Sequence, residues 1–498
     1  MKAKFGWTVW AAIALLVLGA LLRLHGLWAM EFKGDEQEAL TLGTRLLEEH
    51  PWSSSKPWPT HGMLSSYNVA NAPLFTWIVA AAWALTRHPV GVAQLVALTN
   101  AVCLFPLWLW ARRRMDEYRA LVTLALSAVS PFAVIFSRKI WTQDLLLPGV
   151  LAVLWGVEWL RGERPWRGIA LLGVAVLVLG QLHQSGAIAL LLLPIGIGVQ
   201  FLIERRRGVP GIRLVRPSIG ETVALAIAIA LNLFFWLPYL EYLLQLPPET
   251  FANRPKLDIF TVALLRKVAA QVMPVDLFYF FDPHRGDFLR GELRSVFYYG
   301  SVGLGAPLFV YGSWRWLWSP LSVPVFGVWW WCVIGVFTLA RIPSYPFYVL
   351  TLAPLSAVLA AGAFDGPMPR AWMARLLAAW RLTYVAALLG LTIVTEAWLA
   401  GRGGAAGDYG VIYVIREAQA KAVVSRLESR RPEHFYELGE VRQGESLPLG
   451  CGAFPVEVNW VVRWMDAKHR EVPQTLTLCD DWIEQEGRLV YRWTLRDF

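Results

Sequence analysis

Two adjacent carboxylates, Asp35 and Glu36, stand in a charged segment that directly follows the first long apolar run of the chain. Acids at the end of a membrane span are costly to desolvate, so we expect them to face water or a cavity. A carboxylate in such a place can act as a general base on a hydroxyl group. The bland alternative is a solvated acidic pair that favours a helix start through the helix dipole. We take Asp35 as the chemical centre.

Further charged residues stand beside later apolar runs. Asp144 comes just before one such run, and His183 lies between two others. Carboxylates and cations at a membrane–water boundary suit chemistry between a lipid phosphate and a polar acceptor. A lone histidine at the end of a span more often packs or forms a hydrogen bond than binds a ligand. The basic residues at comparable positions are Lys33, Arg138, Lys139 and Arg341, of which Arg138 and Arg341 equally fit the role of interfacial anchors.

The composition places the chain in the membrane class. Of its 498 residues, 56% are hydrophobic, and the mean hydropathy is +0.44. The net charge of +9 is no evidence for nucleic-acid binding, because the arginines cluster in short loops between apolar runs. Lys2 and Lys4 indicate a cytoplasmic N-terminus. Arg23 and His25 stand where a signal peptide would have small residues, so we expect the first span to remain uncleaved.

The apolar runs predict a polytopic α-helical membrane domain over residues 1–400 with roughly eleven transmembrane helices. The run 73–85 is short and has no basic end, so we expect it to form a helix at the outer interface. Charge alternation then places the loop 28–89, which carries Asp35, and the long loop 241–296 on the outer face with Asp144 and His183. The expected spans are 7–22, 90–111, 119–136, 145–160, 168–182, 187–203, 222–240, 297–311, 323–339, 347–361 and 384–399.

From residue 401 onward the composition changes, and we expect a small extracytoplasmic α+β domain over 401–498. The glycine-rich stretch 401–404 is typical of a linker. Periodicity predicts a helix over 408–431, and alternation or β-branched content predicts strands over 456–464, 475–478 and 489–495. Cys451 and Cys479 are a disulfide candidate, worth about 3 kcal/mol if the tail is outside the cytoplasm. Cys103 and Cys332 lie inside apolar runs and are expected to be packing residues.

Three short motifs, in this order, resemble the N-terminal module of the GT-C superfamily of glycosyltransferases. They are Gly34-Asp35-Glu36-Gln37, Asn71-Ala72-Pro73-Leu74, and Ser137-Arg138 followed by Asp144. Segment 341–354 is similar to a basic, tyrosine-containing segment ahead of a late span in that superfamily. The nearest relatives would be family 39 dolichyl-phosphate-mannose protein mannosyltransferases and bacterial lipid A aminoarabinose transferases. The resemblance covers 1–185 well, the middle of the chain by topology alone, and the tail hardly at all.

The resemblance implies a GT-C fold and a sugar donor carried on polyprenyl phosphate, used on the extracytoplasmic side and usually with inversion. It implies that Asp35 is the catalytic base or positions the acceptor, that Glu36 assists, and that Asp144 is the acid before the next inward span. Where those relatives have Pro-Pro or Lys-Pro, this chain has Ala72-Pro73, so a lysine contact to the carrier phosphate is missing. The remaining donor-phosphate candidates are Arg138, Lys139, Arg341, Tyr345 and Tyr348, and the candidate substrate contacts are Lys33 and His183.

The His, Cys, Asp and Glu residues show no spacing along the chain that is typical of metal ligands. Oligosaccharyltransferases of the superfamily hold a divalent ion with acids, so the resemblance names Asp35 and Asp144 as ligands if a divalent cation takes part. The chain has no Walker loop and no GxSxG motif, and nothing in it suggests a soluble nucleotide-sugar site. Tyrosines placed like Tyr345 and Tyr348 are more often part of an interfacial aromatic belt than contacts to the carrier.

The sequence therefore predicts a multi-pass glycosyltransferase of a bacterial or archaeal-type plasma membrane, with a lipid, protein or glycan acceptor and no nucleic-acid partner. One alternative is a transporter or flippase of a lipid-linked sugar. Transporters place ionisable residues near the bilayer midplane, often at broken helices in repeated halves. Here the acids fall at outer span ends and no half-repeat is visible, which favours the enzyme. The second alternative is a membrane scaffold whose tail binds partners.

Overall fold

The computed structural model forms two compact units. Unit 1 comprises Met1–Leu27, Glu38–Leu277 and Leu289–Thr395, and unit 2 comprises Trp28–Gln37, Phe278–Phe288 and Glu396–Phe498. The residues that the structure describes are 6–49, 58–65, 69–162, 164–206, 208, 216–247, 267–270, 272–281, 284–318, 324–339, 346–362, 371–405, 409–415, 417, 462–465, 471–474, 479–485 and 488–494.

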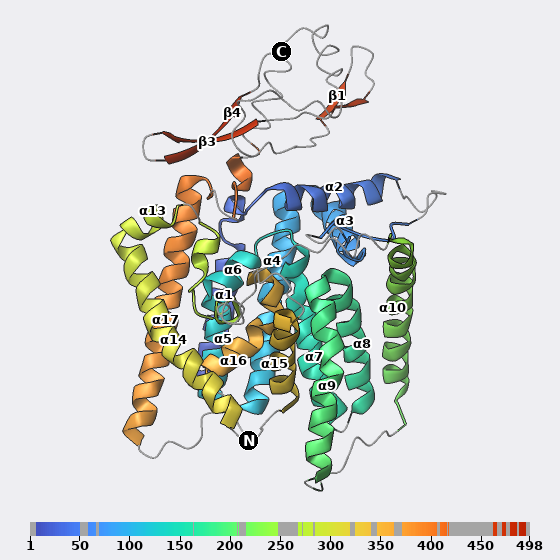
Figure 1. Cartoon of the computed structure of the whole chain (residues 1–498), viewed down its shortest axis with the longest axis vertical. Helices are drawn as coiled ribbons and strands as arrows, with labels where there is room; N and C mark the ends of the chain where they lie inside the picture. The colour runs from blue at the N-terminus through green and yellow to red at the C-terminus, as the bar shows by residue number, and fades with distance from the viewer. Residues whose placement is uncertain are drawn as a thin grey trace. The chain divides into compact units, whose positions relative to one another are not determined.

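Long apolar helices make up most of unit 1 (Figure 1). Within the described residues, seven helical stretches are long and apolar enough to cross a membrane, which supports a multi-pass membrane protein. These are α1 (Trp7–Leu24), α4 (Pro89–Arg114), η2 (Thr142–Leu145) continuing into α7 (Leu146–Leu160), α8 (Pro165–Leu182), α9 (Gln184–Arg206), α10 (Ile219–Gln245) and α17 (Ala371–Arg402).

The remaining helices lie at the other predicted runs and in the loops. They are η1 (Leu27–Ala29), α2 (Gly34–Glu49), α3 (Leu74–Thr86), α5 (Glu117–Val129), α6 (Pro131–Phe136), η3 (Leu277–Tyr279), α13 (Arg285–Arg290), α14 (Glu292–Trp318), α15 (Pro324–Leu339), η4 (Pro346–Leu352) and α16 (Ala353–Ala360). Helix α3 is the helix expected over 73–85. Its placement at an interface and the total of roughly eleven spans stay predictions.

Two expected spans are interrupted. The run 119–136 forms α5 and α6, which are separated at Ser130, whose backbone is extended. Pro131 causes this break, because proline lacks an N–H donor and disfavours the helical conformation of the residue before it. The run 347–361 is likewise divided into η4 and the short helix α16, with a non-helical residue at Val349.

Small residues let helices of unit 1 approach closely, as is common between membrane helices. Gly168 of α8 is the clearest case, because a Cβ atom there would lie 2.3 Å from the Leu160 nitrogen and 2.6 Å from the Gly156 carbonyl oxygen. Elsewhere between α7 and α8, a Cβ on Gly149 would lie 2.7 Å from the Leu179 side chain. Glycine is therefore required for backbone-to-backbone packing of α7 on α8.

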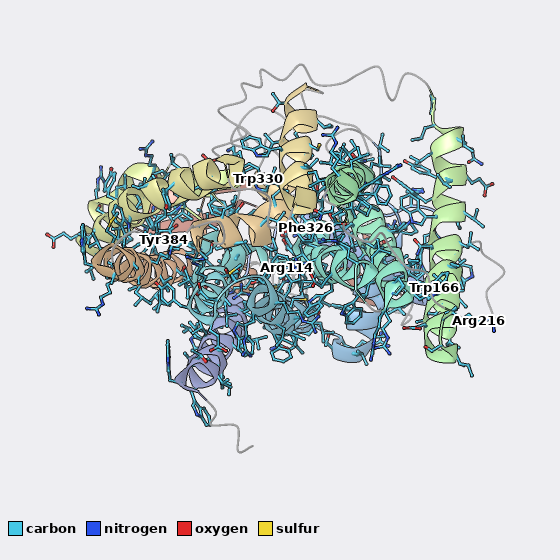
Figure 2. All side chains as sticks on the ribbon, turned by 90° about the horizontal axis from the view of Figure 1, so that it is seen from below. Arg114, Trp166, Arg216, Phe326, Trp330 and Tyr384 are labelled. Carbon is cyan, nitrogen blue, oxygen red and sulfur yellow. The ribbon has the colours of Figure 1, made fainter. Side chains whose placement is uncertain are left out.

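Ion pairs between helices gather at one end of unit 1. Arg112 and Glu117 lie 2.6 Å apart and join α4 to α5, while Arg167 and Glu221 lie 3.2 Å apart and join α8 to α10. The other pairs are Arg114 with Glu158 and Arg161 with Glu204. Figure 2 looks at unit 1 from below and labels Arg114, Trp166 and Arg216 at the ends of α4, α8 and α10.

Contacts at successive heights fix the helix directions. Helices α1 and α5 run the same way, since Thr8 donates to Glu117 near their starts and Arg23 bonds to Ser127 near their ends. Helices α4 and α7 are also parallel, because Asn100 donates to the Asp144 carbonyl oxygen and Arg114 pairs with Glu158. The arginine-rich ends of these helices therefore lie together, which is the grouping that charge alternation predicted.

Unit 2 contains two antiparallel hairpins in the tail. Strand β1 (Val462–Met465) pairs with β2 (Glu471–Gln474), and β3 (Cys479–Gln485) pairs with β4 (Arg488–Thr494). Strand β4 lies where 489–495 was predicted, and β1 overlaps the end of 456–464. Strand β3 was not predicted, because its sequence Cys-Asp-Asp-Trp-Ile-Glu-Gln is rich in acids and only pairing with β4 reveals it. Predicted strand 475–478 lies outside the described residues.

The prediction of a linker over 401–404 is wrong. Residues 401 and 402 continue α17, and Gly403 and Gly404 form a hydrogen-bonded turn. Ile412, which was predicted to lie in a helix over 408–431, instead forms a β-bridge with Glu31. The part of that prediction beyond 417 lies outside the described residues. Residues 413–415 and 417 are helical, as predicted, so long-range pairing overrides the periodicity signal only up to Ile412.

Candidate active site

The acidic segment before and within the first turn of α2 belongs to unit 2. Asp35 is exposed at this helix start, whereas Glu36 is fully buried. The Glu36 carboxylate accepts a hydrogen bond from the Lys33 backbone nitrogen at 2.9 Å. An acid at this position of a helix satisfies an otherwise unpaired backbone donor and suits the positive end of the helix dipole. Glu36 therefore fixes the helix start that presents Asp35.

Glu31 is a buried acid to which the sequence analysis gave no role. Its side chain is fully buried, and its Oε1 lies 2.7 Å from the Lys33 ammonium nitrogen. A charged pair whose carboxylate is buried needs close geometry to offset the cost of desolvation. The signal that was available in the sequence is the alternation of Glu31 and Lys33 around the apolar Phe32. Lys33, expected to contact substrate, is engaged by this acid.

The turn after α6 in unit 1 carries the two predicted cations. Arg138 is buried, and its Nη2 donates to the Gly26 carbonyl oxygen at 2.7 Å. Lys139 is fully buried, with its Nζ 4.1 Å from the ring centroid of Trp141 and 5.3 Å from that of Phe136. Ammonium groups at this distance from an aromatic face are stabilised by the ring quadrupole. The turn thus places two cations in the protein interior.

Asp144 lies on η2, directly after these cations in the chain. Its Oδ2 accepts from the Trp141 backbone nitrogen at 3.3 Å, which caps the start of η2. Its backbone carbonyl oxygen accepts from Asn100 Nδ2 at 2.8 Å, so α4 supports this turn from a second side. Asp144 is 4% exposed. Asn100 was overlooked in the sequence, although an amide inside a predicted span is a recognisable signal.

His183 joins the same unit between α8 and α9. The Ser185 backbone nitrogen donates to its Nδ1 at 3.1 Å, and its Nε2 lies 3.1 Å from Gln143 Nε2. Its ring stacks on Tyr348 with centroids 5.3 Å apart. Burial lowers the pKa of His183 to about 3, so the imidazole is neutral near pH 7. These contacts match the expectation for a lone histidine that packs and forms hydrogen bonds.

A small cavity of about 60 Å³ lies beside Asp144 within unit 1. That volume has room for a few water molecules. Its polar lining comes from Arg23, Asn100, Ser137, Gln143 and Asp144. Its apolar lining comes from Leu104, Leu107, Leu126, Ala133, Phe136, Leu147, Val272, Leu350, Ala353, Pro354 and Ala357, together with the backbone-bonded Ser127.

Arg23 is the second residue of this cavity that the sequence analysis left without a role at the site. It is 2% exposed, and its two terminal nitrogens donate to the carbonyl oxygens of Gly19, Ser127 and Ala128 at 2.8–3.0 Å. A guanidinium group buried in an apolar helix needs such partners. Its position in the last turn of α1 was visible in the sequence, where it was used only to exclude a cleavage site.

The predicted site residues are divided between the two units. Arg138, Lys139, Asp144, His183 and Tyr348 all belong to unit 1. Lys33, Asp35 and Glu36 belong to unit 2. Arg341, Tyr345 and Cys451 lie outside the described residues, so the disulfide with Cys479 and two donor contacts stay predictions.

A divalent metal was named as a candidate cofactor for Asp35 and Asp144. In the described part of the chain, no three His, Cys, Asp or Glu side chains gather in a way that would hold a metal ion. Two of the acids near Asp35 already have protein partners, namely Glu31 with Lys33 and Glu36 with the Lys33 backbone. Binding of a divalent cation by Asp35 and Asp144 therefore stays a prediction.

Comparison with known proteins gives solved structures only. No family model and no curated protein matches the chain. ArnT from Cupriavidus metallidurans in the apo state is similar over 80% of this chain and 78% of its own, with 14% identity and a TM-score of 0.48. The Archaeoglobus fulgidus oligosaccharyltransferase in the apo form is similar over 88% of this chain and 60% of its own, with 15% identity and a TM-score of 0.45.

A third solved structure is the archaeal oligosaccharyltransferase AglB from Archaeoglobus fulgidus in complex with an inhibitory peptide and a dolichol-phosphate. The similarity extends over 88% of this chain and 60% of the AglB chain, with 13% identity and a TM-score of 0.47. Similarities at this TM-score carry no argument about activity. The functional assignment therefore depends on the residues of this chain.

Proposed function

We propose that this protein is an integral membrane glycosyltransferase of the GT-C type, which moves a sugar from a polyprenyl-phosphate donor to a hydroxyl acceptor. Asp35 is the general base. The proposal combines the motif resemblance of Asp35, Arg138 and Asp144 with the apolar helices of unit 1. The active side of the membrane is the extracytoplasmic one.

The observation that carries the proposal is the different environment of three neighbouring acids. Asp35 is exposed on the first turn of α2, while Glu31 and Glu36 are fully buried. Glu31 pairs with Lys33, and Glu36 caps the helix start at the Lys33 nitrogen. A general base must reach the proton of a bound hydroxyl group. Asp35 is exposed, and this is why we propose it, among these three acids, as the base.

The proposed step is a direct displacement at the anomeric carbon. Asp35 removes the proton from the acceptor hydroxyl as its oxygen forms a bond to that carbon. The bond from the anomeric carbon to the phosphate oxygen breaks, and polyprenyl phosphate leaves with the electron pair. The product has the inverted configuration. The developing charge on the leaving phosphate calls for cations, and Arg138, Lys139 and Arg341 are the proposed source.

Substitution of Asp35 by Asn tests the proposal. The substrates are short-chain polyprenyl-phosphate mannose and polyprenyl-phosphate aminoarabinose, given to purified full-length protein together with a membrane lipid and protein extract as acceptor. Release of polyprenyl phosphate is measured by chromatography. We expect Asp35→Asn to reduce turnover by about 10²–10⁴-fold, the range of general-base catalysis.

The matched control is Asp116→Asn, because Asp116 also stands at a helix start and caps α5 by accepting from the Arg119 nitrogen. Asn is an equally good cap, so this variant should keep full turnover. Turnover by Asp35→Asn equal to that of the wild type would refute Asp35 as the base. Flux of a lipid-linked sugar across vesicles without any bond formation by the wild type would favour the flippase instead.

A further inference from the structure

A segment that follows α17 pairs with residues 30–32, which lead to Asp35. This segment, called the strap here, consists of residues 403–405 and 409–413. The Phe32 nitrogen donates to the Val411 carbonyl oxygen at 2.8 Å, and the Tyr413 nitrogen donates to the Met30 carbonyl oxygen at 2.8 Å. Between these bonds, Glu31 and Ile412 form an antiparallel bridge. Both partners belong to unit 2.

Two tyrosines of the strap add side-chain contacts to this pairing. Tyr409 is buried, and its hydroxyl group donates to the Ala29 carbonyl oxygen at 2.8 Å. Tyr413 is also buried and meets the Phe32 ring edge-to-face, with centroids 5.2 Å apart. An aromatic pair of this geometry contributes about 0.5–1.5 kcal/mol beyond its buried area. The strap therefore holds the backbone from Ala29 to Phe32 at three successive points.

Glycines give the strap its fixed path. Gly404 has φ +122°, and a Cβ atom there would lie 2.2 Å from the Gly410 carbonyl oxygen. Gly410 has φ +69°, which L-residues with a side chain rarely adopt. The strap also bonds to itself, since the Ala405 nitrogen donates to the Gly410 carbonyl oxygen at 2.9 Å and the Ile412 nitrogen donates to the Gly403 carbonyl oxygen at 3.1 Å. The strap is thus a built element of unit 2.

We infer that the strap is a positioning element for the catalytic base, with Tyr409 and Gly410 as its key residues. The segment Met30–Phe32, which the strap holds, leads through Lys33 directly into the first turn of α2, which carries Asp35. Lys33 itself is tied to Glu31 by its ammonium group and to Glu36 by its nitrogen. Tyr409 and Gly410 do not act on the substrate; they set the backbone that carries Asp35. The role in catalysis rests on the proposed function.

Kinetics of full-length variants test the inference. Tyr409→Phe removes the hydrogen bond to Ala29, and Gly410→Ala opposes the left-handed backbone. With the donor that the wild type turns over, we expect each variant to lower kcat by at least tenfold while the donor KM changes less than twofold. A strap that only supports folding would lower the amount of active protein and the melting temperature but leave kcat per folded molecule unchanged.

Two controls are matched to these changes. Tyr299→Phe removes the hydroxyl group of an exposed tyrosine, and Gly401→Ala adds a methyl group in open space on α17. Both should keep wild-type kinetics. Wild-type kcat in both strap variants, measured on protein that is folded, would overturn the inference.

A readout that needs no activity separates this inference from the proposed function. A nitroxide spin label is placed at position 35 by Asp35→Cys in a full-length chain whose four native cysteines are replaced by alanine. We expect an immobilised electron paramagnetic resonance spectrum, and an added mobile component after Gly410→Ala but not after Gly401→Ala. If these spectra are found but the wild-type protein shows no turnover, the proposed reaction is refuted while the positioning role of the strap is supported. Identical spectra in all three proteins would overturn the strap.

Discussion

Three acids of one short segment have three different environments, although the chain gives them the same chemical group. Glu31 is buried against Lys33, Glu36 is buried at a helix start, and Asp35 is exposed. Desolvation makes a buried carboxylate stable only with partners, whereas an exposed one can exchange water for substrate. At the level of the residue, its exposure is the reason why we propose Asp35, rather than Glu31 or Glu36, as the base. Glu31 and Glu36 stabilise the segment through their contacts with the side chain and the backbone of Lys33.

Asn100 provides a test of the turn that carries Asp144. Its Nδ2 donates to the Asp144 carbonyl oxygen at 2.8 Å and to the Val96 carbonyl oxygen at 3.0 Å. Asn100→Leu leaves the buried Asp144 carbonyl without this donor and should destabilise the protein by about 1–3 kcal/mol. Thr99→Val is the control, since Thr99 bonds only to Leu95 of its own helix. Thermal unfolding in detergent measures both, and equal melting temperatures would contradict the supporting role.

His183 predicts a dependence of stability on pH. Its pKa is lowered from 6.5 to about 3 by burial, so the folded protein holds the neutral form. The contribution of the buried neutral imidazole to the free energy of unfolding is present above pH 6.5. It is lost as the pH falls from 6.5 toward 3, because protonation then favours the unfolded chain. Between pH 7.5 and 5.5 the wild type should lose about 1.4 kcal/mol relative to His183→Gln, which does not titrate. A constant difference between the two unfolding curves would contradict the buried neutral imidazole.

At the level of the element, the local sequence determines where each helix begins and ends, and small residues determine where two helices pack closely. Pro131 divides the predicted span 119–136, and it is this break that delivers the turn with Arg138 and Lys139. Helix α7 packs on α8 through Gly149, Gly156 and Gly168. Close approach of two backbones increases dispersion contacts, which drive helix association where water is absent.

A pair of glycine substitutions tests this packing. Gly168→Ala would place a methyl group 2.3 Å from the Leu160 nitrogen, so α8 must move away from α7. We expect a loss of about 1–3 kcal/mol from this overpacking. Gly198→Ala is the control on the exposed face of α9, where a Cβ meets nothing within 4 Å and alanine favours the helix by about 0.5–1 kcal/mol. Both melting temperatures are measured in the same detergent, and a stable Gly168→Ala variant would refute the close approach.

At the level of the whole molecule, orientation in the membrane follows from which end of each helix is basic. Helix α10 has 27 residues and is therefore about 40 Å long, which exceeds the roughly 30 Å apolar core of a bilayer. Arg216 stands before its start. Near its other end, the Tyr242 hydroxyl group accepts from the Ala70 nitrogen at 3.2 Å. These two ends should face opposite compartments.

Cysteine labelling in intact cells checks this orientation. In a chain without native cysteines, Leu64→Cys introduces an exposed thiol near Ala70, and Arg216→Cys introduces one before α10. A membrane-impermeant maleimide should label position 64 in intact cells and position 216 only after permeabilisation, because basic ends stay in the cytoplasm. The reverse pattern would place loop 28–89, which carries Asp35, on the cytoplasmic side and would overturn the proposed side of the reaction.

Much of unit 1 follows from the sequence alone. A helix lies at each run that was predicted to span, and the arginine-rich ends of several helices meet at one end of the unit. These properties are local. An apolar run of bilayer length favours insertion into the membrane, and a basic flank favours the cytoplasmic side, independently of the rest of the chain. The same reasoning found Asp35, Arg138 and Asp144 as charged groups beside such runs.

The tertiary structure alone decided which of these groups are buried and what holds them. Tyr409 bonds to Ala29 across a sequence separation of 380 residues, and a glycine stretch that looked like a linker forms part of that pairing. Asn100 and Arg23 support the cavity beside Asp144 through contacts with other helices. No local pattern encodes such contacts, because their stability comes from partners that become neighbours only when the chain is folded.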